Sequence, residues 1–179
     1  KAIEDPLGDQ CKRLEMMEAG RLLMPGLPIM VRLDGRAFHT FTRGMARPFD
    51  VRFMVCMQGA ASSLLDDMHA SVAYTQSDEI TLAWAPKKDQ PFGGRIQKMT
   101  SVLAGLCSAA FMREIFILGV TDWMDKLPHF DCRVWSVPDL AEAINVFQWR
   151  EDDATKNSVS MAAQSLFSQK ELHGKKSAD

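Results

Sequence analysis

The pattern of apolar and polar positions along the chain predicts a mixed α/β protein. Runs rich in apolar and β-branched residues are typical of strands, and they lie at 29–33, 72–82 and 131–137. The middle run contains a polar turn, so it is predicted to form two short strands joined tightly. Apolar residues at helical spacing predict helices over 14–23, 51–67, 92–116, 138–149 and 153–167.

The order of these elements predicts the topology. A strand, a helix, a strand pair, a helix and a strand spell β-α-β-β-α-β, the ferredoxin-like split unit. We therefore expect an α+β fold, with one antiparallel sheet, helices on one face and additional C-terminal helices. A single domain is expected over residues 1–179, with its core at about 28–137 and a helical part at about 138–179.

Composition and charge narrow the function classes. The net charge of −2 gives no global attraction to nucleic acid, so any such binding must come from local basic patches. No apolar run is expected to span a membrane, and no secretory signal is recognised. The four cysteines are widely spaced and lack a zinc-binding pattern, so buried free thiols in a reducing, cytoplasmic compartment are expected.

Carboxylates follow two of the predicted strands, and these are the first candidates for chemistry. The first strand runs into Asp34 and Gly35, and the turn of the strand pair carries Ser77, Asp78 and Glu79. Acids at a hairpin turn are commonly just solvated turn residues. However, the predicted topology places the first strand beside the hairpin, so we expect Asp34 to face Asp78 across the sheet. Two such carboxylates suit magnesium, and the Gly35 backbone could approach the metal or a phosphate.

Basic residues offer candidate phosphate contacts. Arg95 and Lys98 lie three apart on a predicted helix that begins at Gly93-Gly94, where free amides and the helix dipole favour an anion. The alternative is a solvated helix face. A basic tail cluster contains Lys170, His173, Lys175 and Lys176, and it is either a frayed terminus or a triphosphate or RNA contact.

The residues that follow Asp34 and Gly35 include candidate base contacts. Phe38 could stack on a base or belong to the core, and His39 could contact a base or be an ordinary exposed histidine. The chain has no Gly-x-x-x-x-Gly-Lys, Gly-x-Gly-x-x-Gly or Gly-x-Ser-x-Gly motif, which argues against P-loop, Rossmann and hydrolase-type sites.

In combination, these stretches resemble the tRNA-His guanylyltransferase superfamily. The matching motifs, in order, are Asp34-Gly35-Arg36-Ala37-Phe38-His39, Pro48-x-Asp50, Tyr74-x-Gln76-Ser77-Asp78-Glu79, Arg95-x-x-Lys98, Phe130-Asp131-x-Arg133, Trp149-Arg150 and Asp153. Members of this family extend RNA in the 3′-to-5′ direction on a fold similar to the polymerase palm.

The resemblance implies a catalytic site with two magnesium ions. Asp34, Asp78 and the Gly35 carbonyl would hold the metals, with Glu79 beside them in a supporting role. Nucleotide-binding residues implied in the same way are Asp34, Gly35, Arg36, Ala37, Phe38, His39, Ser77, Asp78, Arg95 and Lys98. Asn157 and Lys175 are further candidate contacts to triphosphate or RNA. The implied partners are tRNA, ATP or GTP and other nucleoside triphosphates, and the implied assembly is a homotetramer.

One departure from the family pattern indicates which branch of the family the chain resembles. Eukaryotic members carry His-Ile-Asn-Asn-Leu-Tyr-Asn where this chain has residues 155–161, and only Asn157 is kept. This resembles the Thg1-like branch, which adds nucleotides in a template-dependent way and repairs truncated tRNA 5′ ends. Two alternatives stay open: another palm-type enzyme such as a nucleotide cyclase, and a non-catalytic tRNA-binding module.

Overall fold

The fold is built on a four-stranded antiparallel sheet. The computed structural model describes residues 5–174. The strands are β1 (Ile29–Gly35), β2 (Val72–Gln76), β3 (Glu79–Trp84) and β4 (Phe130–Ser136), in the order β2-β3-β1-β4. The longer helices are α1 (Pro6–Ala19), α3 (Val51–Asp67), α4 (Ile96–Ile117) and α5 (Leu140–Leu166). Short helical turns complete the chain: α2 (Phe38–Phe41), α6 (Gln169–Leu172) and 3₁₀ turns at Pro91–Gly94 and Thr121–Lys126. The predicted β-α-β-β-α-β order and ferredoxin-like sheet are confirmed.

The register of β1 separates an apolar end of the sheet from an acidic end. At one end Ile29 lies opposite Trp84 of β3, and at the other end Asp34 lies opposite Glu79. On the other side of β1, Asp34 lies opposite Asp131 of β4. Since directly opposed side chains point to the same face of a sheet, three carboxylates gather at this end.

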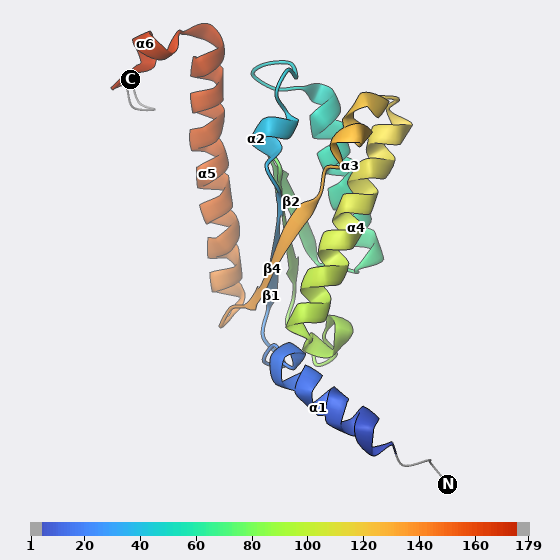
Figure 1. Ribbon diagram of the computed structural model, residues 1–179. Helices are drawn as coiled ribbons and strands as arrows, with labels where there is room; N and C mark the ends of the chain where they lie inside the picture. Colours follow the sequence, from blue (N-terminus) through green and yellow to red (C-terminus); the bar gives the residue numbers. More distant parts are fainter. Residues whose placement is uncertain (1–4, 175–179) are drawn as a thin grey trace.

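Helices α3 and α4 cover one face of the sheet and enclose the main core (Figure 1). This core is rich in aromatic rings at the acidic end: Phe38, Phe41, Phe53, Phe111 and Phe130. The ring centroids of Phe38 and Phe130 are 5.0 Å apart, which joins α2 to β4. Full burial of a side chain of this size stabilises the fold by about 1.5–3 kcal/mol. The cluster therefore fixes the loop that follows Asp34.

Helix α5 covers the opposite face of the sheet (Figure 1). Its first turns pack on a smaller core formed by Met30, Ala83, Val137 and Ala143, against which Trp135, Val146 and Phe147 also pack. The Phe147 ring meets Tyr74 of β2 edge-on, with centroids 6.4 Å apart. The sheet thus has helices on both faces, and the expectation of helices on one face holds only for the two helices inside the β-α-β-β-α-β unit.

Several helix boundaries differ from the sequence-based expectations. The first helix begins at Pro6, because the Asp5 side chain caps it through the Gly8 amide at 2.9 Å. Helix α4 starts at Ile96 and not at 92, since Phe92, Gly93 and Gly94 adopt positive φ angles. The two helices expected over 138–167 are one continuous helix of 27 residues. No glycine or proline interrupts this stretch, and Arg150 pairs with Asp153 across the expected break.

Helix α4 also corrects the expectation about apolar segments. By length and composition alone, this helix could cross a membrane. Its buried residues pack on the sheet instead, and they are Met99, Leu103, Cys107, Ala110, Phe111 and Ile115. A core helix of this kind meets the same criterion, so the segment is weak evidence for a membrane protein. The cysteines are free as expected, and Cys56, Cys107 and Cys132 are buried, but Cys11 is exposed because no residue of α1 is buried.

Candidate active site

Asp34 and Asp78 meet where β1 ends beside the turn between β2 and β3. The Gly35 amide donates a hydrogen bond to the Asp78 carbonyl at 3.0 Å, which ties the end of β1 to that turn. A Cβ atom at Gly35 would lie 2.4 Å from Cγ of the Phe38 ring, so only glycine fits between the strand and α2. The site therefore stands on backbone that is fixed by a hydrogen bond on one side and by the aromatic core on the other.

The charge around Asp34 favours a bound cation. Partial burial raises the pKa of Asp34, and the neighbouring carboxylates of Asp78 and Asp131 raise it further. Arg133 and Arg32 lower the pKa but do not reverse the shift. A bound cation would stabilise the ionised form of Asp34 against burial and these neighbouring carboxylates.

The donor set fits magnesium better than a transition metal. Two carboxylates and the Gly35 carbonyl are hard oxygen donors, and Mg²⁺ is commonly held by one or two carboxylates together with water and substrate phosphates. Within residues 5–174, no group of three or more His, Cys, Asp or Glu side chains is placed to hold a metal ion. A closed, all-protein metal cage is thus absent from the described part, whereas a site completed by phosphates remains compatible with Asp34, Gly35 and Asp78.

The expected geometry of the carboxylates needs one correction. Asp34 was expected to face Asp78 across the sheet, but its partner in the register is Glu79. Asp78 lies in the turn itself, one residue earlier, because β2 ends at Gln76 and β3 begins at Glu79. The Asp78 carboxylate still approaches Asp34 closely enough to raise its pKa.

Glu79 is engaged in ion pairs on the sheet. Its side chain is buried, and its carboxylate oxygens lie 3.7 Å from Nε of Arg32 and 3.3 Å from Nε of Arg150. Burial raises the pKa of Glu79 against the opposing effect of both arginines. Glu79 is therefore a partner of two cations and not a free ligand, which limits the catalytic role expected for it.

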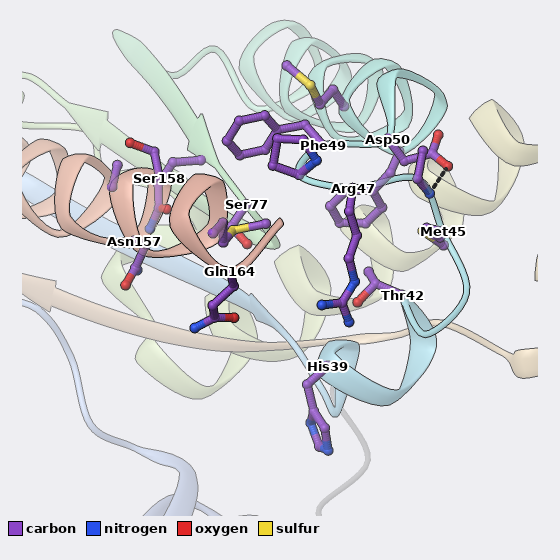
Figure 2. Close-up of a pocket in the computed structure, with 17 residues that line it drawn as sticks. His39, Thr42, Met45, Arg47, Phe49, Asp50, Ser77, Asn157, Ser158 and Gln164 are labelled. Carbon is purple, nitrogen blue, oxygen red and sulfur yellow. Dashed lines mark hydrogen bonds between the residues drawn. The ribbon is translucent and has the colours of Figure 1, made fainter. Parts of the chain in front are cut away.

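A cavity of about 440 Å³ opens beside the acids. It is enclosed by α2 and the loop after it, the start of α3, the β2–β3 turn and the second half of α5. In Figure 2, the Arg47 guanidinium points into the space between Thr42 and Gln164. Asn157 and Ser158 of α5 line the cavity further along that helix. The volume lies in the range of small-molecule sites.

The loop that forms the floor of this cavity is held by a buried carboxylate. Asp50 accepts hydrogen bonds from the Ala46 amide at 3.1 Å and from the Arg52 amide at 3.0 Å, and its pair with the Arg52 guanidinium is 2.7 Å long. The hydrogen bonds to Arg52 hold the pKa of Asp50 well below its usual range. Asp50 also caps α3, so it fixes the cavity floor relative to that helix.

The structure brings some of the expected nucleotide-binding residues together. His39, Ser77 and Asn157 all line the cavity. Phe38 does not, because its ring is only 2% exposed and belongs to the aromatic core. Stacking of Phe38 on a base is therefore excluded, and only its backbone is available to a ligand.

The neighbours of Phe38 in the same motif are exposed. Ala37 adopts a left-handed conformation with φ of 57°, which turns the chain from β1 into α2. The Arg36 guanidinium lies 3.4 Å from Nε2 of His129, a residue that no sequence motif indicates.

Arg95 and Lys98 lie far from the acids within this chain. Arg95 bridges to Leu22 near the apolar end of the sheet, and its side chain donates to the Phe92 carbonyl at 3.1 Å. Further along α4, Ser108 reaches the acidic end, where its hydroxyl accepts a hydrogen bond from the Phe130 amide. The 13 residues between positions 95 and 108 of a helix span roughly 20 Å. These two cations therefore do not join the Asp34 site in a single chain.

Residues at the C-terminal end are only partly placed. His173 lines a second cavity of about 560 Å³ next to Arg47 and Gln164, which both cavities share. Lys175, expected to contact triphosphate or RNA, lies outside the described residues.

Three residues near the acids were not assigned a role from the sequence. Asp131 and Arg133 lie on β4 beside Asp34, and Arg32 lies two residues before it on the same face. Asp131 and Arg133 were visible as part of a motif, but only strand pairing shows that they share a face with Asp34. The alternation along the strand would have indicated Arg32.

One protein family and several solved structures match most of this chain. The family described as Thg1, tRNAHis guanylyltransferase, matches residues 9–138. A bacterial tRNAHis guanylyltransferase (Thg1)-like protein in complex with ATP has 35% sequence identity and a TM-score of 0.88, over 97% of this chain and 76% of that one. A bacterial protein of the same description in complex with GTP has 34% identity and a TM-score of 0.81, over 90% and 77% of the two chains.

Curated relatives match at lower identity. The tRNA(His) guanylyltransferase of Debaryomyces hansenii is 27% identical over 151 residues, which are 82% of this chain and 57% of the relative. The corresponding protein of Schizosaccharomyces pombe is 29% identical over 147 residues, or 76% of this chain and 53% of the relative. The chain thus spans little more than half the length of these two relatives.

Proposed function

Because the chain belongs to the Thg1 family of tRNAHis guanylyltransferases, we propose that it is a magnesium-dependent nucleotidyltransferase that adds nucleotides to the 5′ end of tRNA. The observation that carries this proposal is that the turn between β2 and β3 contributes residues both to the cavity and to the pair of acids. Ser77 of that turn lines the cavity, and the next residue, Asp78, lies beside Asp34. A nucleoside in the cavity would therefore extend its phosphates toward the two carboxylates.

Asp34, Asp78 and the Gly35 carbonyl are the residues that would hold the magnesium ions. When bound, the metal supplies charge neutralisation on the phosphates and lowers the pKa of an attacking hydroxyl. The raised pKa of Asp34 supports this assignment, since a cation would stabilise its ionised form. Asp131 and Arg133 flank the pair and adjust the local charge without being needed as ligands.

The reaction we propose has two nucleotidyl transfers. In the first, a 5′-monophosphate oxygen of tRNA attacks the α-phosphate of ATP or GTP, and pyrophosphate leaves. In the second, the 3′-hydroxyl of an incoming nucleoside triphosphate attacks the activated 5′ phosphate, and the activating nucleoside monophosphate leaves. The chain contributes binding and orientation: the cavity holds the nucleoside, and the Arg47 guanidinium within it offers positive charge to a phosphate or a polar base edge (Figure 2).

We further propose template-dependent repair of tRNA 5′ ends as the specific activity. The support is the 155–161 segment, which differs from the eukaryotic motif and keeps only Asn157. In the structure this segment belongs to the part of α5 that faces the cavity. Because its side chains differ from those of the eukaryotic motif, this part of α5 presents a different surface to the nucleotide or the RNA end.

The distance between Arg95 and Asp34 leads to a proposal about assembly. If Arg95 and Lys98 bind triphosphate at an acid site, that site belongs to a neighbouring copy of the chain. We propose that the expected homotetramer brings them there. The two cations are exposed and lie at the far end of the sheet from their own acids.

A repair assay tests the proposed function. A tRNA that lacks its first nucleotide and carries a 5′-monophosphate is incubated with the protein, Mg²⁺, ATP and all four nucleoside triphosphates. Sequencing of the 5′ ends should show the missing nucleotide restored, and chelation of Mg²⁺ should prevent it. Asp122→Ala, which changes an exposed acid on the turn Thr121–Lys126, should keep full activity.

Two other results would contradict the proposal. Formation of a cyclic nucleotide from labelled GTP in the absence of RNA would identify a cyclase. Binding of tRNA that is indifferent both to Mg²⁺ and to Asp78→Ala, without any product, would identify a non-catalytic RNA-binding module.

A further inference from the structure

The second half of α5 forms one wall of the cavity, but little packing holds it in place. The buried residues of this helix are Ala143 and Arg150, and both precede the cavity wall. The residues of α5 that line the cavity are Ala154, Asn157, Ser158, Met161 and Gln164. In Figure 1, this half of α5 extends beyond the ends of the strands. Its position relative to the cavity therefore depends on the contacts immediately before it.

Arg150 makes those contacts from a buried position. It is 4% exposed, and its Nη1 lies 3.5 Å and its Nε 3.3 Å from the two carboxylate oxygens of Glu79. Its Nη2 donates to Asp153 at 2.7 Å, and the guanidinium stacks on the Trp149 ring at 3.9 Å. A buried guanidinium is stable only when it is paired, and loss of one partner leaves an uncompensated charge. Arg150 thus links α5 to β3 through its ion pair with Glu79.

The same contacts continue to the cavity wall. Asp153 accepts a hydrogen bond from the Asn157 side chain at 3.4 Å, and Asn157 lines the cavity. On the other side of Arg150, Glu79 comes directly after Asp78 in the sequence, and Asp78 comes directly after Ser77, the turn residue that lines the cavity. A continuous polar connection therefore joins the two walls of the cavity, through Glu79, Arg150, Asp153 and Asn157.

We infer that Arg150 is a positioning residue for nucleotide binding. It holds the second half of α5 at the separation from the β2–β3 turn that the bound nucleotide requires, and it acts through Glu79 and Asp153 without touching the ligand. This inference rests on the proposed binding of a nucleoside triphosphate in the cavity. A misplaced wall also misplaces the bound nucleotide relative to Asp34 and Asp78, and a displacement near 1 Å costs about a hundredfold in rate in well-oriented active sites.

The test compares Arg150→Met with Arg113→Met. Arg113 is an exposed residue of α4, on the opposite face of the sheet from α5, and it pairs with the partly buried Glu114 at 3.0 Å, so the same chemical change there leaves the cavity untouched. Affinity for ATP and for GTP is measured by calorimetry, and amide hydrogen exchange is followed over residues 154–166. We expect Arg150→Met to raise the Kd up to about tenfold, as for the loss of one polar contact, and to accelerate exchange in that segment. Exchange in α3 and α4 should stay as in the unmodified protein, and Arg113→Met should match the unmodified protein in both measurements.

The outcomes separate the inference from the proposed function. Equal affinity in Arg150→Met and Arg113→Met, or exchange that accelerates throughout the molecule instead of in 154–166, overturns the inference. If Arg150→Met fails to fold, Asp153→Asn decides, because Asp153 is partly exposed and this change removes the carboxylate charge that connects Arg150 to Asn157, while the Arg150–Glu79 pair stays. Asp153→Asn that binds nucleotide as tightly as the unmodified protein overturns the inference as well. If the unmodified protein itself binds neither ATP nor GTP, the proposed function fails, and the exchange measurement alone decides whether Arg150 holds α5.

Discussion

At the scale of single residues, Asp34 carries an electrostatic conflict within the site. Burial and the carboxylates of Asp78 and Asp131 all disfavour its ionised form, and they outweigh Arg133 and Arg32. Proteins accept such unfavourable charge where function requires it, and it often marks a ligand site. The conflict has consequences for stability and for pH dependence, and each can be measured.

Removal of the Asp34 charge should stabilise the metal-free protein while it abolishes activity. The pKa of Asp34 in the folded state lies above its ordinary value of 3.8. The group therefore favours folding below that value, and this contribution is lost as the pH rises through the folded pKa. At pH 7 in EDTA, Asp34→Asn should show a higher Tm than the unmodified protein, and at pH 3 the difference should shrink. Nucleotidyl transfer should fall by at least about a hundredfold, as for loss of one electrostatic contact in an active site. A Tm of Asp34→Asn below that of the unmodified protein at pH 7 would contradict the claim that the ionised Asp34 destabilises the fold.

Removal of the neighbouring acid should shift the acid limb of the pH–activity profile. Asp131 raises the pKa of Asp34, so Asp131→Asn should lower that pKa and let Asp34 stay ionised at more acidic pH. The rate measured as a function of pH should then fall off at a lower pH than in the unmodified protein. Asp125→Asn, an exposed acid on the turn Thr121–Lys126, serves as the control and should leave the profile unchanged. An acid limb that moves to higher pH in Asp131→Asn would contradict the account.

At the scale of elements, the junction between β1 and α2 decides whether the acids are presented correctly. Gly35 ends the strand, forms the hydrogen bond to Asp78 and makes room for Phe38. The Phe38 ring in turn contacts β4 through Phe130, so a change at Gly35 is transmitted to the aromatic core.

Gly35→Ala should destabilise the fold because its Cβ would overlap the Phe38 ring. Overpacking of this kind costs about 1–3 kcal/mol in the free energy of unfolding, which urea denaturation measures. Gly105→Ala is the matched control, since a Cβ at this position of α4 meets no atom within 4 Å. That change should stabilise the protein by about 0.5–1 kcal/mol through the higher helix propensity of alanine. Equal stability of Gly35→Ala and the unmodified protein would show that the junction is not tightly packed.

The sequence predicts most elements but not their tertiary contacts. Alternation and helical spacing are local signals, and they located the strands and the helices α3 and α4 to within a few residues. The continuity of α5 was missed because Glu151 and Asp152 look like a polar break, whereas the Arg150–Asp153 pair spans this point. Likewise, the pairing of Glu79 with Arg150 joins residues 71 positions apart, and no local pattern encodes it.

At the scale of the whole molecule, the two groups expected to bind triphosphate lie at opposite ends of the sheet. Asp34 and Asp78 occupy one end, and Arg95 and Lys98 lie near the other, beside the segment around Leu22. The sequence placed all of them in one site, because motifs give order along the chain and not distance. Only the direction in which α4 crosses the sheet reveals the separation (Figure 1).

This separation predicts complementation between inactive variants. Asp78→Ala removes the acid site, and the double variant Arg95→Ala, Lys98→Ala removes the cations while keeping the acids. If neighbouring copies share a site, dissociated and reassembled mixtures should regain part of the tRNA-extending activity, since some assemblies pair intact acids with intact cations. Neither variant alone should be active, and mixing without reassembly is the control. A reassembled mixture that stays as inactive as its components would contradict the shared site.

The central claim is that the Asp34–Asp78 site activates the 5′ end of RNA, and one measurement tests it most directly. The protein is incubated with Mg²⁺, ATP labelled at the α-phosphate and a 5′-monophosphorylated tRNA, without other nucleoside triphosphates. The account predicts label joined to the tRNA 5′ end in a form that phosphatase does not remove, and none with Asp78→Ala. Label transfer that persists in Asp78→Ala, or that is absent from the unmodified protein although it binds both ATP and tRNA, would contradict it.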